Sequence, residues 1–298
     1  MKNNAIAIVI NAAFVKYAKT LIKSIQSNWP NHPQILLFLS ETIGQEDRLY
    51  FESTPKLKTV NFNPNDYEYR KALITTGTGF STTGFNDAGY FIVNFWSPAF
   101  EQYDNILVLD ADMLVLKNLD ELVSQENFFA VSAANPRRFP IFDIKKKGIG
   151  KIFEFATIYL RALCRGIVVK PGKSINSGVL VIPKKWRTQK KYEEILQLLK
   201  NFYSHCPSDQ EIIYLWMLKN RIAERQDFRM NFQARFINAL ASNILPRKFS
   251  KQVQAASADI HILHFNGPKP DSARFKTHPW TTGRDDLVDL YLQYASKP

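Results

Sequence analysis

Short apolar segments alternate with amphipathic patterns along the first third of the chain. The apolar segments are five or six residues long, and most are hydrophobic on both faces, which is typical of strands buried inside a parallel sheet. Between them, apolar residues recur at helical spacing, as Leu21, Ile22 and Ile25 do. This alternation predicts an α/β fold with a mixed, mainly parallel central sheet flanked by helices.

The same patterns place the expected elements along the whole chain. We expect strands at residues 5–10, 34–39, 58–62, 105–109, 128–132, 178–182 and 259–265, and helices at 17–28, 45–52, 87–103, 191–203, 209–219 and 285–294. Pro98 is expected to break the third helix, and Ser208 to cap the fifth. Residues 75–89 hold four glycines and are expected to form a loop. The length of 298 residues suits one large domain, so residues 1–298 are expected to fold as one.

The basic charge of the chain is concentrated in one segment. The net charge is +12, and residues 137–173 carry ten Lys and Arg against two acidic residues. An apolar, aromatic-bearing run lies inside this segment, which we interpret as an insertion in the domain. It is either a helix buried against the sheet or an amphipathic segment that lies at an anionic membrane surface. No nucleic-acid-binding motif accompanies the charge, so a nucleic acid partner is not expected.

Cysteine content and hydropathy bear on the location of the protein. Two cysteines, Cys164 and Cys206, exclude a disulfide framework and a four-cysteine metal site. No run of about 18 apolar residues predicts a membrane-spanning helix, and the N-terminal segment lacks the cleavage site of a signal peptide. We expect a reducing, cytoplasmic location, on the cytoplasmic face of the membrane if the basic segment binds lipid.

Two carboxylates, Asp110 and Asp112, follow the buried strand expected at 105–109. Residues two apart on an extended chain point to the same side, so the two side chains are expected to converge on one cation. Carboxylate oxygens suit hard ions such as Mn²⁺ or Mg²⁺. In parallel sheets, ligands bind at the carboxyl ends of the strands, where this pair stands. A solvated strand end with two polar residues is the alternative.

A second motif places His264 where the last expected strand runs into a turn that contains Gly267. Lys269 follows within reach of a phosphate. His261 lies three residues before His264, so it is expected on the opposite side of the strand, as a structural histidine. We therefore expect His264 to be the metal ligand of the two.

Two further motifs carry polar side chains at the starts of elements. Asn176 precedes an apolar strand in the sequence Asn-Ser-Gly-Val, and Asp209 and Gln210 begin an expected helix. By themselves, these patterns describe a turn into a strand and a helix capping box equally well. The same side chains are also well placed for polar contacts to a sugar.

In this order and together, the four motifs resemble those of a family of retaining glycosyltransferases, family 8, which includes glycogenin, bacterial lipopolysaccharide glucosyl- and galactosyltransferases and galactinol synthase. The Asp-x-Asp motif continues into a Leu-Val-Leu and Glu-Leu pattern up to Leu122, and the closing motif from His264 to Pro270 matches in part. The resemblance extends from Ala5 to Pro270. It implies a Rossmann-like GT-A domain, a UDP-glucose or UDP-galactose donor, Mn²⁺ or Mg²⁺ as cofactor, and a glycan, glycolipid or protein acceptor, as in lipopolysaccharide or polysaccharide biosynthesis.

The resemblance also assigns roles to single residues. It implies that Asp110, Asp112 and His264 hold the metal, and that Tyr17 stacks on the uracil ring. The other implied donor contacts are Asn11 and Ala12 at the base and ribose, Gly267 and Lys269 at the diphosphate, and Asn176, Asp209 and Gln210 at the transferred sugar. Ala111, between the two aspartates, is also an implied donor-binding residue. Asp209 or Gln210 is the candidate catalytic group on the far side of the anomeric carbon, and a front-face reaction is the alternative.

The sequence departs from the family pattern in three places. The closing motif is one residue short and has Asp271 in place of a tryptophan, Ile92 stands where the family carries Lys or Arg, and Cys206 stands where glycogenin has an acidic residue. Two other classes of function remain as alternatives: a basic protein that binds a membrane or nucleic acid, and a sugar nucleotidyltransferase. The latter class has a phosphate loop rich in Gly and basic residues after the first strand, whereas residues 11–14 here are Asn-Ala-Ala-Phe.

Overall fold

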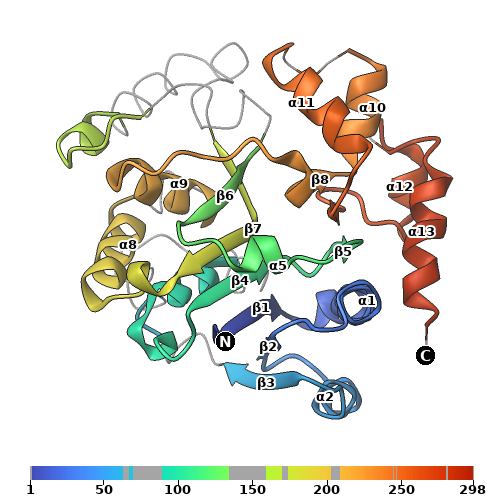
Figure 1. The fold of residues 1–298 in the computed structure, drawn as a ribbon, viewed down its shortest axis with the longest axis horizontal. Helices are drawn as coiled ribbons and strands as arrows, with labels where there is room; N and C mark the ends of the chain where they lie inside the picture. Colours follow the sequence, from blue (N-terminus) through green and yellow to red (C-terminus); the bar gives the residue numbers. More distant parts are fainter. Residues whose placement is uncertain are drawn as a thin grey trace.

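A six-stranded sheet runs through the centre of the protein in the order β3-β2-β1-β4-β7-β6 (Figure 1). The structure, a computed structural model, describes residues 2–62, 67–69, 89–133, 159–169, 174–202, 209–243, 245, 247–279 and 281–297. The strands of this sheet are β1 (Asn4–Ile10), β2 (Gln34–Ser40), β3 (Leu57–Phe62), β4 (Asn105–Leu109), β6 (Phe129–Ser132) and β7 (Ile175–Pro183). The first four run parallel, and β7 is antiparallel to both of its neighbours. The predicted mixed, mainly parallel sheet is therefore confirmed.

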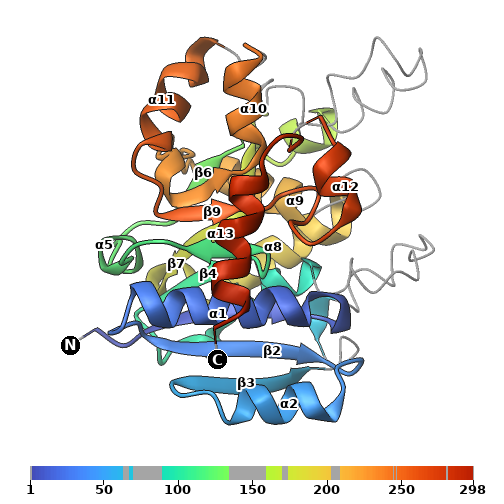
Figure 2. The ribbon, with the colours of Figure 1, turned by 90° about the vertical axis from the view of Figure 1, so that its right-hand side faces the viewer.

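Helices cover both faces of this sheet because the residues of its strands alternate between two hydrophobic cores. In β1, Ile6 and Ile8 face the core that includes α1 (Val15–Asn28) and α13 (Asp285–Ala295). Ala5 and Ala7 face the other core, which includes α8 (Gln189–Phe202) and α9 (Asp209–Lys219). The first and last helices, α1 and α13, pack on one another along one side of the molecule (Figure 2).

A second, three-stranded sheet lies beyond the end of β4. It consists of β5 (Met113–Val115), β9 (Ile262–His264) and β8 (Phe232–Gln233), in the order β5-β9-β8. The antiparallel pairing of β5 with β9 sets Met113 opposite His264. The neighbouring helices are η6 (Phe228–Asn231), α10 (Arg235–Ala241) and α11 (Arg247–Ser257). The sequence analysis predicted neither β5 nor β8, because strands of two or three residues are too short to show a period.

Three predicted elements differ from the observed ones by more than two residues. The single helix predicted at 87–103 is confirmed at residues 89–90, which are α-helical, and is wrong from residue 91 onward, where two 3₁₀ helices form, η3 (Phe91–Trp96) and η4 (Pro98–Phe100). The Ser97 hydroxyl caps η4 by accepting a hydrogen bond from the Ala99 N–H at 3.2 Å. Pro98 begins η4 because proline suits the first position of a helix, whereas its missing N–H cannot continue the hydrogen bonds of the helix before it. Strand β7 begins three residues earlier than predicted, and β9 is shorter than the predicted 259–265.

Helix α2 (Gln45–Glu52) has its predicted bounds. The other helices whose ends are both described are short: η1 (Ala12–Phe14), α5 (Asp120–Val123), η5 (Lys184–Trp186) and α12 (Ala273–Thr277). Residues 159–163 are also helical. Most of the predicted loop at 75–89 and of the basic insertion at 137–173 lies outside the described residues, as do Ser208 and Cys206. Within the described ranges, no helix is long and apolar enough to cross a membrane.

Candidate functional site

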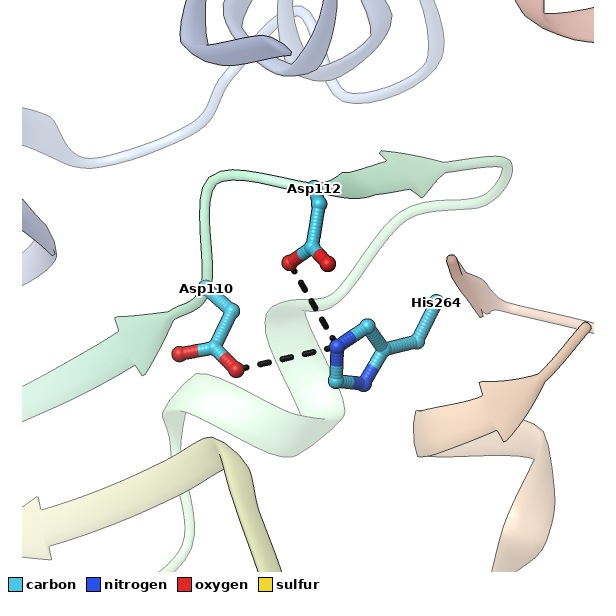
Figure 3. Close-up of side chains that lie close together, drawn as sticks. All are labelled: Asp110, Asp112 and His264. Carbon is cyan, nitrogen blue, oxygen red and sulfur yellow. Dashed lines mark ion pairs between the residues drawn. The ribbon is translucent and has the colours of Figure 1, made fainter. Parts of the chain in front are cut away.

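Two carboxylates and one imidazole from distant parts of the chain meet at the junction of the two sheets. Asp110 follows β4, Asp112 precedes β5, and His264 is the last residue of β9. The Nε2 atom of His264 lies 3.6 Å from Oδ2 of Asp110 and 3.4 Å from Oδ1 of Asp112. Figure 3 shows both carboxylates turned toward this one nitrogen. One ligand atom from each residue lies within 4.8 Å of the others, a spacing that can hold a metal ion.

The two carboxylates converge for a reason that differs from the predicted strand alternation. Residues 110–112 form a bend between β4 and β5 rather than extended strand. Backbone hydrogen bonds hold both ends of this bend: the Asp110 N–H donates to the Gly178 carbonyl, and the Asp112 carbonyl accepts from the Phe265 N–H, each at 2.9 Å. The neighbouring strands β7 and β9 therefore set the positions of the two aspartates.

The two histidines of the closing motif have different surroundings. Nε2 of His261 lies 3.3 Å from Asp259, a surface residue that also forms ion pairs with Lys117 and Arg229. His264 is almost fully buried, with its Nδ1 2.9 Å from Oδ1 of Asn231. The structure thus brings His264, and not His261, to the two carboxylates.

Charges around the cluster act differently on its two carboxylates. Lys269 forms an ion pair with Asp112, whose side chain is 8% exposed. Burial alone would raise the pKa of Asp112, but the charges and hydrogen bonds of His264 and Lys269 hold that pKa well below its usual range. The pKa of Asp110 is raised, because the walls of the site desolvate its carboxylate and Asp112 adds negative charge. The side chain of Asp110 is 46% exposed, so water moderates this shift.

The cluster opens into a cavity of about 590 Å³ at the carboxyl ends of β1 and β4. The sequence analysis singled out many of its lining residues, which are Asn11, Asp110, Ala111, Asp112, Asn176, Asp209, Gln210, His264, Gly267 and Lys269. Val9, Phe14, Gly89, Ile92 and Asn266 are among the other lining residues. One wall of the cavity is therefore anionic or polar, and part of the remainder is apolar.

Tyr17 and Ala12 are not among the residues that line this cavity. Tyr17 is 7% exposed and packs between Phe14 and Tyr291, and its hydroxyl donates a hydrogen bond to Asp271 at 2.8 Å. Burial first, and then Asp271, raise the pKa of the Tyr17 hydroxyl well above its usual value. The N–H of Ala12, which is exposed, donates to the Thr42 hydroxyl at 3.4 Å.

Phe14 is the aromatic residue of this region that does line the cavity. It ends the 3₁₀ helix η1, directly after β1, and its ring centroid is 5.7 Å from Nζ of Lys269. Phe14 was not predicted as a site residue. Its position three residues after Asn11, at the carboxyl end of a parallel strand, was the available signal.

Asp209 and Gln210 begin α9 on another wall of the cavity. Burial is the main cause that raises the pKa of Asp209 to about 7, followed by the negative charge of Asp110. Ser177 offsets part of this shift with a side-chain hydrogen bond. Ile92 lines the same cavity and is 5% exposed, so an apolar side chain stands where the resemblance implied Lys or Arg.

Asn176 lies on β7 and connects the cavity wall to a residue that the sequence analysis did not name. Its Oδ1 accepts hydrogen bonds from the Gly178 N–H at 3.1 Å and from Nδ2 of Asn231 at 2.8 Å. Asn231 ends η6 and is fully buried. No motif marked Asn231, because it lies in a short helix that the hydrophobic pattern does not reveal.

The three cluster residues fit the divalent ion that the resemblance implied. Two carboxylates from the bend between β4 and β5 and one imidazole from the end of β9 supply an oxygen-rich donor set with one nitrogen. Carboxylates suit Mg²⁺ and Mn²⁺, and an imidazole ligand favours Mn²⁺ over the strictly oxygen-seeking Mg²⁺. The hydrogen bond from His264 to Asn231 orients the ring toward the carboxylates, as the outer contacts of metal-binding histidines do.

The chain is similar to known glycosyltransferases in sequence and in fold. The chain matches the family model described as Glycosyl transferase family 8 over residues 5–270. Its structure is similar to that of galactosyltransferase LgtC in complex with donor and acceptor sugar analogs, at 17% identity and a TM-score of 0.62, covering 98% of this chain and 95% of that one. Sequence comparison with curated proteins finds no match.

Two further solved structures share the fold over nearly the whole chain. The apo structure of the bifunctional glycosyltransferase WbbM is 15% identical with a TM-score of 0.66, and the match covers 99% of this chain but only 50% of WbbM. The glycosyltransferase GlyE of Streptococcus pneumoniae is 18% identical with a TM-score of 0.59, over 100% of this chain and 61% of that one. The chain thus has the GT-A fold and spans about half the length of WbbM.

Proposed function

The chain belongs to glycosyl transferase family 8, and we propose that it transfers glucose or galactose from a UDP-sugar to a glycan or lipid-linked acceptor, with retention of configuration and with Mn²⁺ as its cofactor. One observation carries this proposal: Asp110, Asp112 and His264 converge at the floor of a cavity whose other wall bears Asp209 and Gln210. A metal site and a polar sugar site in one cavity are what a nucleotide-sugar transferase needs.

The residues in and around the cluster would stabilise the negative charge of the leaving diphosphate in different ways. Asp110, Asp112 and His264 would hold the divalent ion, which supplies positive charge to the departing UDP. Lys269 lies beside Asp112, so its ammonium group is placed to add a second positive charge at the same point. Gly267 lines the cavity with a φ of 120°, a conformation that favours glycine and lets the backbone approach a ligand closely.

The opposite wall would orient the transferred sugar. Asn176, Asp209 and Gln210 present short polar side chains to the cavity, and Gln210 is buried to 9% exposure. Asp209 or Gln210 would contact the far side of the anomeric carbon. Both a nucleophilic role for one of these groups and a front-face reaction that they stabilise fit this arrangement.

For the nucleobase, the cavity favours Phe14 over the Tyr17 that the resemblance implied. The ring of Phe14 lines the cavity, whereas Tyr17 is buried and bonded to Asp271. Asn11, at the end of β1, lines the same region. We assign the base-stacking role to Phe14 and a structural role to Tyr17.

Product analysis and calorimetry test the proposal. Mass spectrometry after incubation with a panel of UDP-sugars, with and without Mn²⁺, should reveal hexose transfer to a glycan or to water only when the ion is present. UDP with Mn²⁺ should bind more tightly than GDP with Mn²⁺. Asp112→Asn should abolish both metal binding and transfer, while Asp47→Asn, in a surface ion pair with Lys19, should leave both unchanged. Transfer by Asp112→Asn in the presence of a chelator would exclude the metal assignment.

We also propose that the acceptor lies at an anionic membrane surface, and the described part of the basic insertion supports this. Leu160, Leu163 and Val168 are exposed by 61%, 60% and 65%, so one short segment presents three aliphatic side chains to the outside. Arg161 and Arg165 are exposed between them. Basic side chains interleaved with exposed aliphatic ones suit an anionic bilayer, where each Arg near the surface is worth about 1 kcal/mol.

The competing interpretation, a helix buried against the sheet, accounts for other residues of the same segment. Ala162 and Ile167 are buried, so residues 159–169 present one face to the protein and another to the outside.

Sedimentation with vesicles separates the two interpretations. The protein should bind vesicles of anionic lipid at low salt, and Leu160→Gln with Leu163→Gln should reduce that binding. The exposed Leu49→Gln on α2 is the matched control. Equal binding to neutral and anionic vesicles would refute the membrane proposal.

A further inference from the structure

A chain of three hydrogen bonds runs from the backbone of β7 to the proposed metal ligand. The Gly178 N–H donates to Oδ1 of Asn176, Nδ2 of Asn231 donates to the same oxygen, and Oδ1 of Asn231 faces Nδ1 of His264. Asn231, in the middle, is 0% exposed and lies on η6, outside the motifs that define the site. We propose that Asn231 is a positioning residue that sets both the tautomer of His264 and the orientation of the Asn176 amide.

The donor and the acceptor of each of these hydrogen bonds follow from the one bond whose donor is certain. A backbone N–H can only donate, so the atom of Asn176 that faces Gly178 must be the amide oxygen. That oxygen also faces Asn231, which must then present its NH₂ group to Asn176. The carbonyl oxygen of the Asn231 amide is therefore the atom that faces His264. Reversing either amide would set two donors or two acceptors against each other in a buried place, and each buried polar group left unsatisfied in this way destabilises the structure.

Two consequences for the site follow. First, Nδ1 of His264 must carry a proton to donate to Asn231, so in the neutral ring Nε2 keeps its lone pair on the side of Asp110 and Asp112. Only that tautomer can bind a cation together with the carboxylates. Second, both hydrogen bonds that the Asn176 side chain makes with other described residues use its oxygen, so its NH₂ group is the part left to donate toward the cavity. A sugar hydroxyl or ring oxygen is the chemistry that accepts such a bond.

Asn231 therefore connects the metal end of the site to the sugar end. The inference rests on the proposed function for the identity of the ligands, but the hydrogen-bond direction does not depend on it. Two substitutions separate the two roles. Asn231→Ala removes the contacts to His264 and to Asn176 together. Asn231→Asp keeps an oxygen acceptor for the His264 Nδ1–H but turns a second acceptor toward the Asn176 oxygen, so only the Asn176 contact is lost.

Calorimetry with Mn²⁺ alone and with UDP should show this separation. We expect Asn231→Ala to weaken Mn²⁺ binding by about 10–100-fold, the usual effect of removing a partner of a metal-bound histidine. Asn231→Asp should bind Mn²⁺ and UDP at least as well as the wild type, yet lose the additional affinity that the sugar of a UDP-sugar contributes. Asn105→Ala is the control, because Asn105 is a buried asparagine whose side chain donates to the Val123 carbonyl, away from the site.

Three outcomes would overturn the inference: wild-type Mn²⁺ affinity in Asn231→Ala, equal losses in the Ala and Asp variants, or an unchanged sugar contribution in Asn231→Asp. A measurement on the unaltered protein covers the case in which the variants do not fold. Nitrogen NMR of metal-free, histidine-labelled protein should show a proton on Nδ1 of His264, whether or not Nε2 also carries one. A ring protonated at Nε2 alone would refute the proposed direction of the hydrogen bonds. This readout needs neither metal nor donor, so it distinguishes failure of this inference from failure of the proposed function.

Discussion

Gly178 lies directly behind the imidazole of His264. A Cβ atom at Gly178 would stand 2.6 Å from Cε1 of His264 and 2.7 Å from Oδ2 of Asp110. Real Cβ contacts do not approach this closely, so any side chain at this point of β7 forces its neighbours to move. The side chains of the cluster leave no room for a Cβ atom, and this explains why the Asn-Ser-Gly-Val motif has a glycine at this position. The backbone conformation of Gly178 does not itself require glycine.

We therefore predict that Gly178→Ala displaces two of the three candidate metal ligands. Mn²⁺ affinity should fall by about tenfold or more, and the overpacking should cost about 1–3 kcal/mol of the free energy of unfolding. Calorimetric titration and denaturant unfolding measure the two effects. Gly44→Ala is the control, since nothing lies within 4 Å of a Cβ at Gly44. Unchanged Mn²⁺ affinity in Gly178→Ala would mean that the cluster is not the metal site.

The two histidines of the closing motif should respond differently to substitution. His264→Ala removes a candidate ligand and should weaken Mn²⁺ binding by more than about tenfold. His261→Ala removes a partly exposed contact with Asp259, away from the cluster, so its effect should be confined to a small loss of stability. Titration of both variants with Mn²⁺ gives the comparison. Loss of affinity in His261→Ala alone would show that the wrong histidine was assigned.

The nucleobase should depend on Phe14 rather than on Tyr17. Base stacking on an aromatic ring is worth about 1–3 kcal/mol, so Phe14→Leu should weaken UDP binding in the presence of Mn²⁺ by about that amount. Tyr17→Phe should leave UDP affinity unchanged but destabilise the protein by about 1 kcal/mol, because Asp271 loses a hydrogen-bond donor. Calorimetry with UDP and thermal unfolding of both variants test this. The opposite ranking in UDP affinity would favour the assignment of Tyr17 by resemblance.

The raised pKa of Asp209 predicts a pH-dependent cost in stability. Its folded-state pKa of about 7 exceeds the ordinary value near 3.8, so the folded state holds the proton more tightly than the unfolded state does. The metal-free protein should therefore lose stability as the pH rises from about 4 to about 7. Asp209→Asn cannot lose this proton, so it should match the wild type near pH 4 and exceed it by on the order of 2 kcal/mol at pH 8.

Denaturant unfolding across this pH range, with a chelator present, measures that difference. Asp47→Asn is the comparison, because its carboxylate lies in a partly exposed ion pair with Lys19. A constant difference between Asp209→Asn and the wild type from pH 4 to pH 8 would show that burial does not raise the pKa of Asp209.

The fold class and several elements were predictable from the sequence, because they depend on local patterns. Continuous apolar runs identify β1, β2 and β4, since strands buried on both faces must be hydrophobic throughout. Apolar spacing identifies α1, α2 and α13 in the same way. Pro98 marked a break correctly, but local pattern did not reveal that the residues before it form a 3₁₀ helix. The small strands β5 and β8 carried too little pattern to be found.

The motifs marked most of the residues that line the cavity, but tertiary structure decided how those residues meet. His264 reaches Asp112 because β9 pairs with β5, and Asn231 reaches both His264 and Asn176 because η6 packs between the two sheets. The side chain of Tyr17 is likewise held away from the cavity by its hydrogen bond to Asp271 and its ring contact with Tyr291, both more than 250 residues away in the sequence. Local sequence determines which segments become strands and helices, because the pattern of apolar residues acts over a few neighbours. The side-chain contacts of the site form between segments far apart in the chain, so only the packing of those segments determines them.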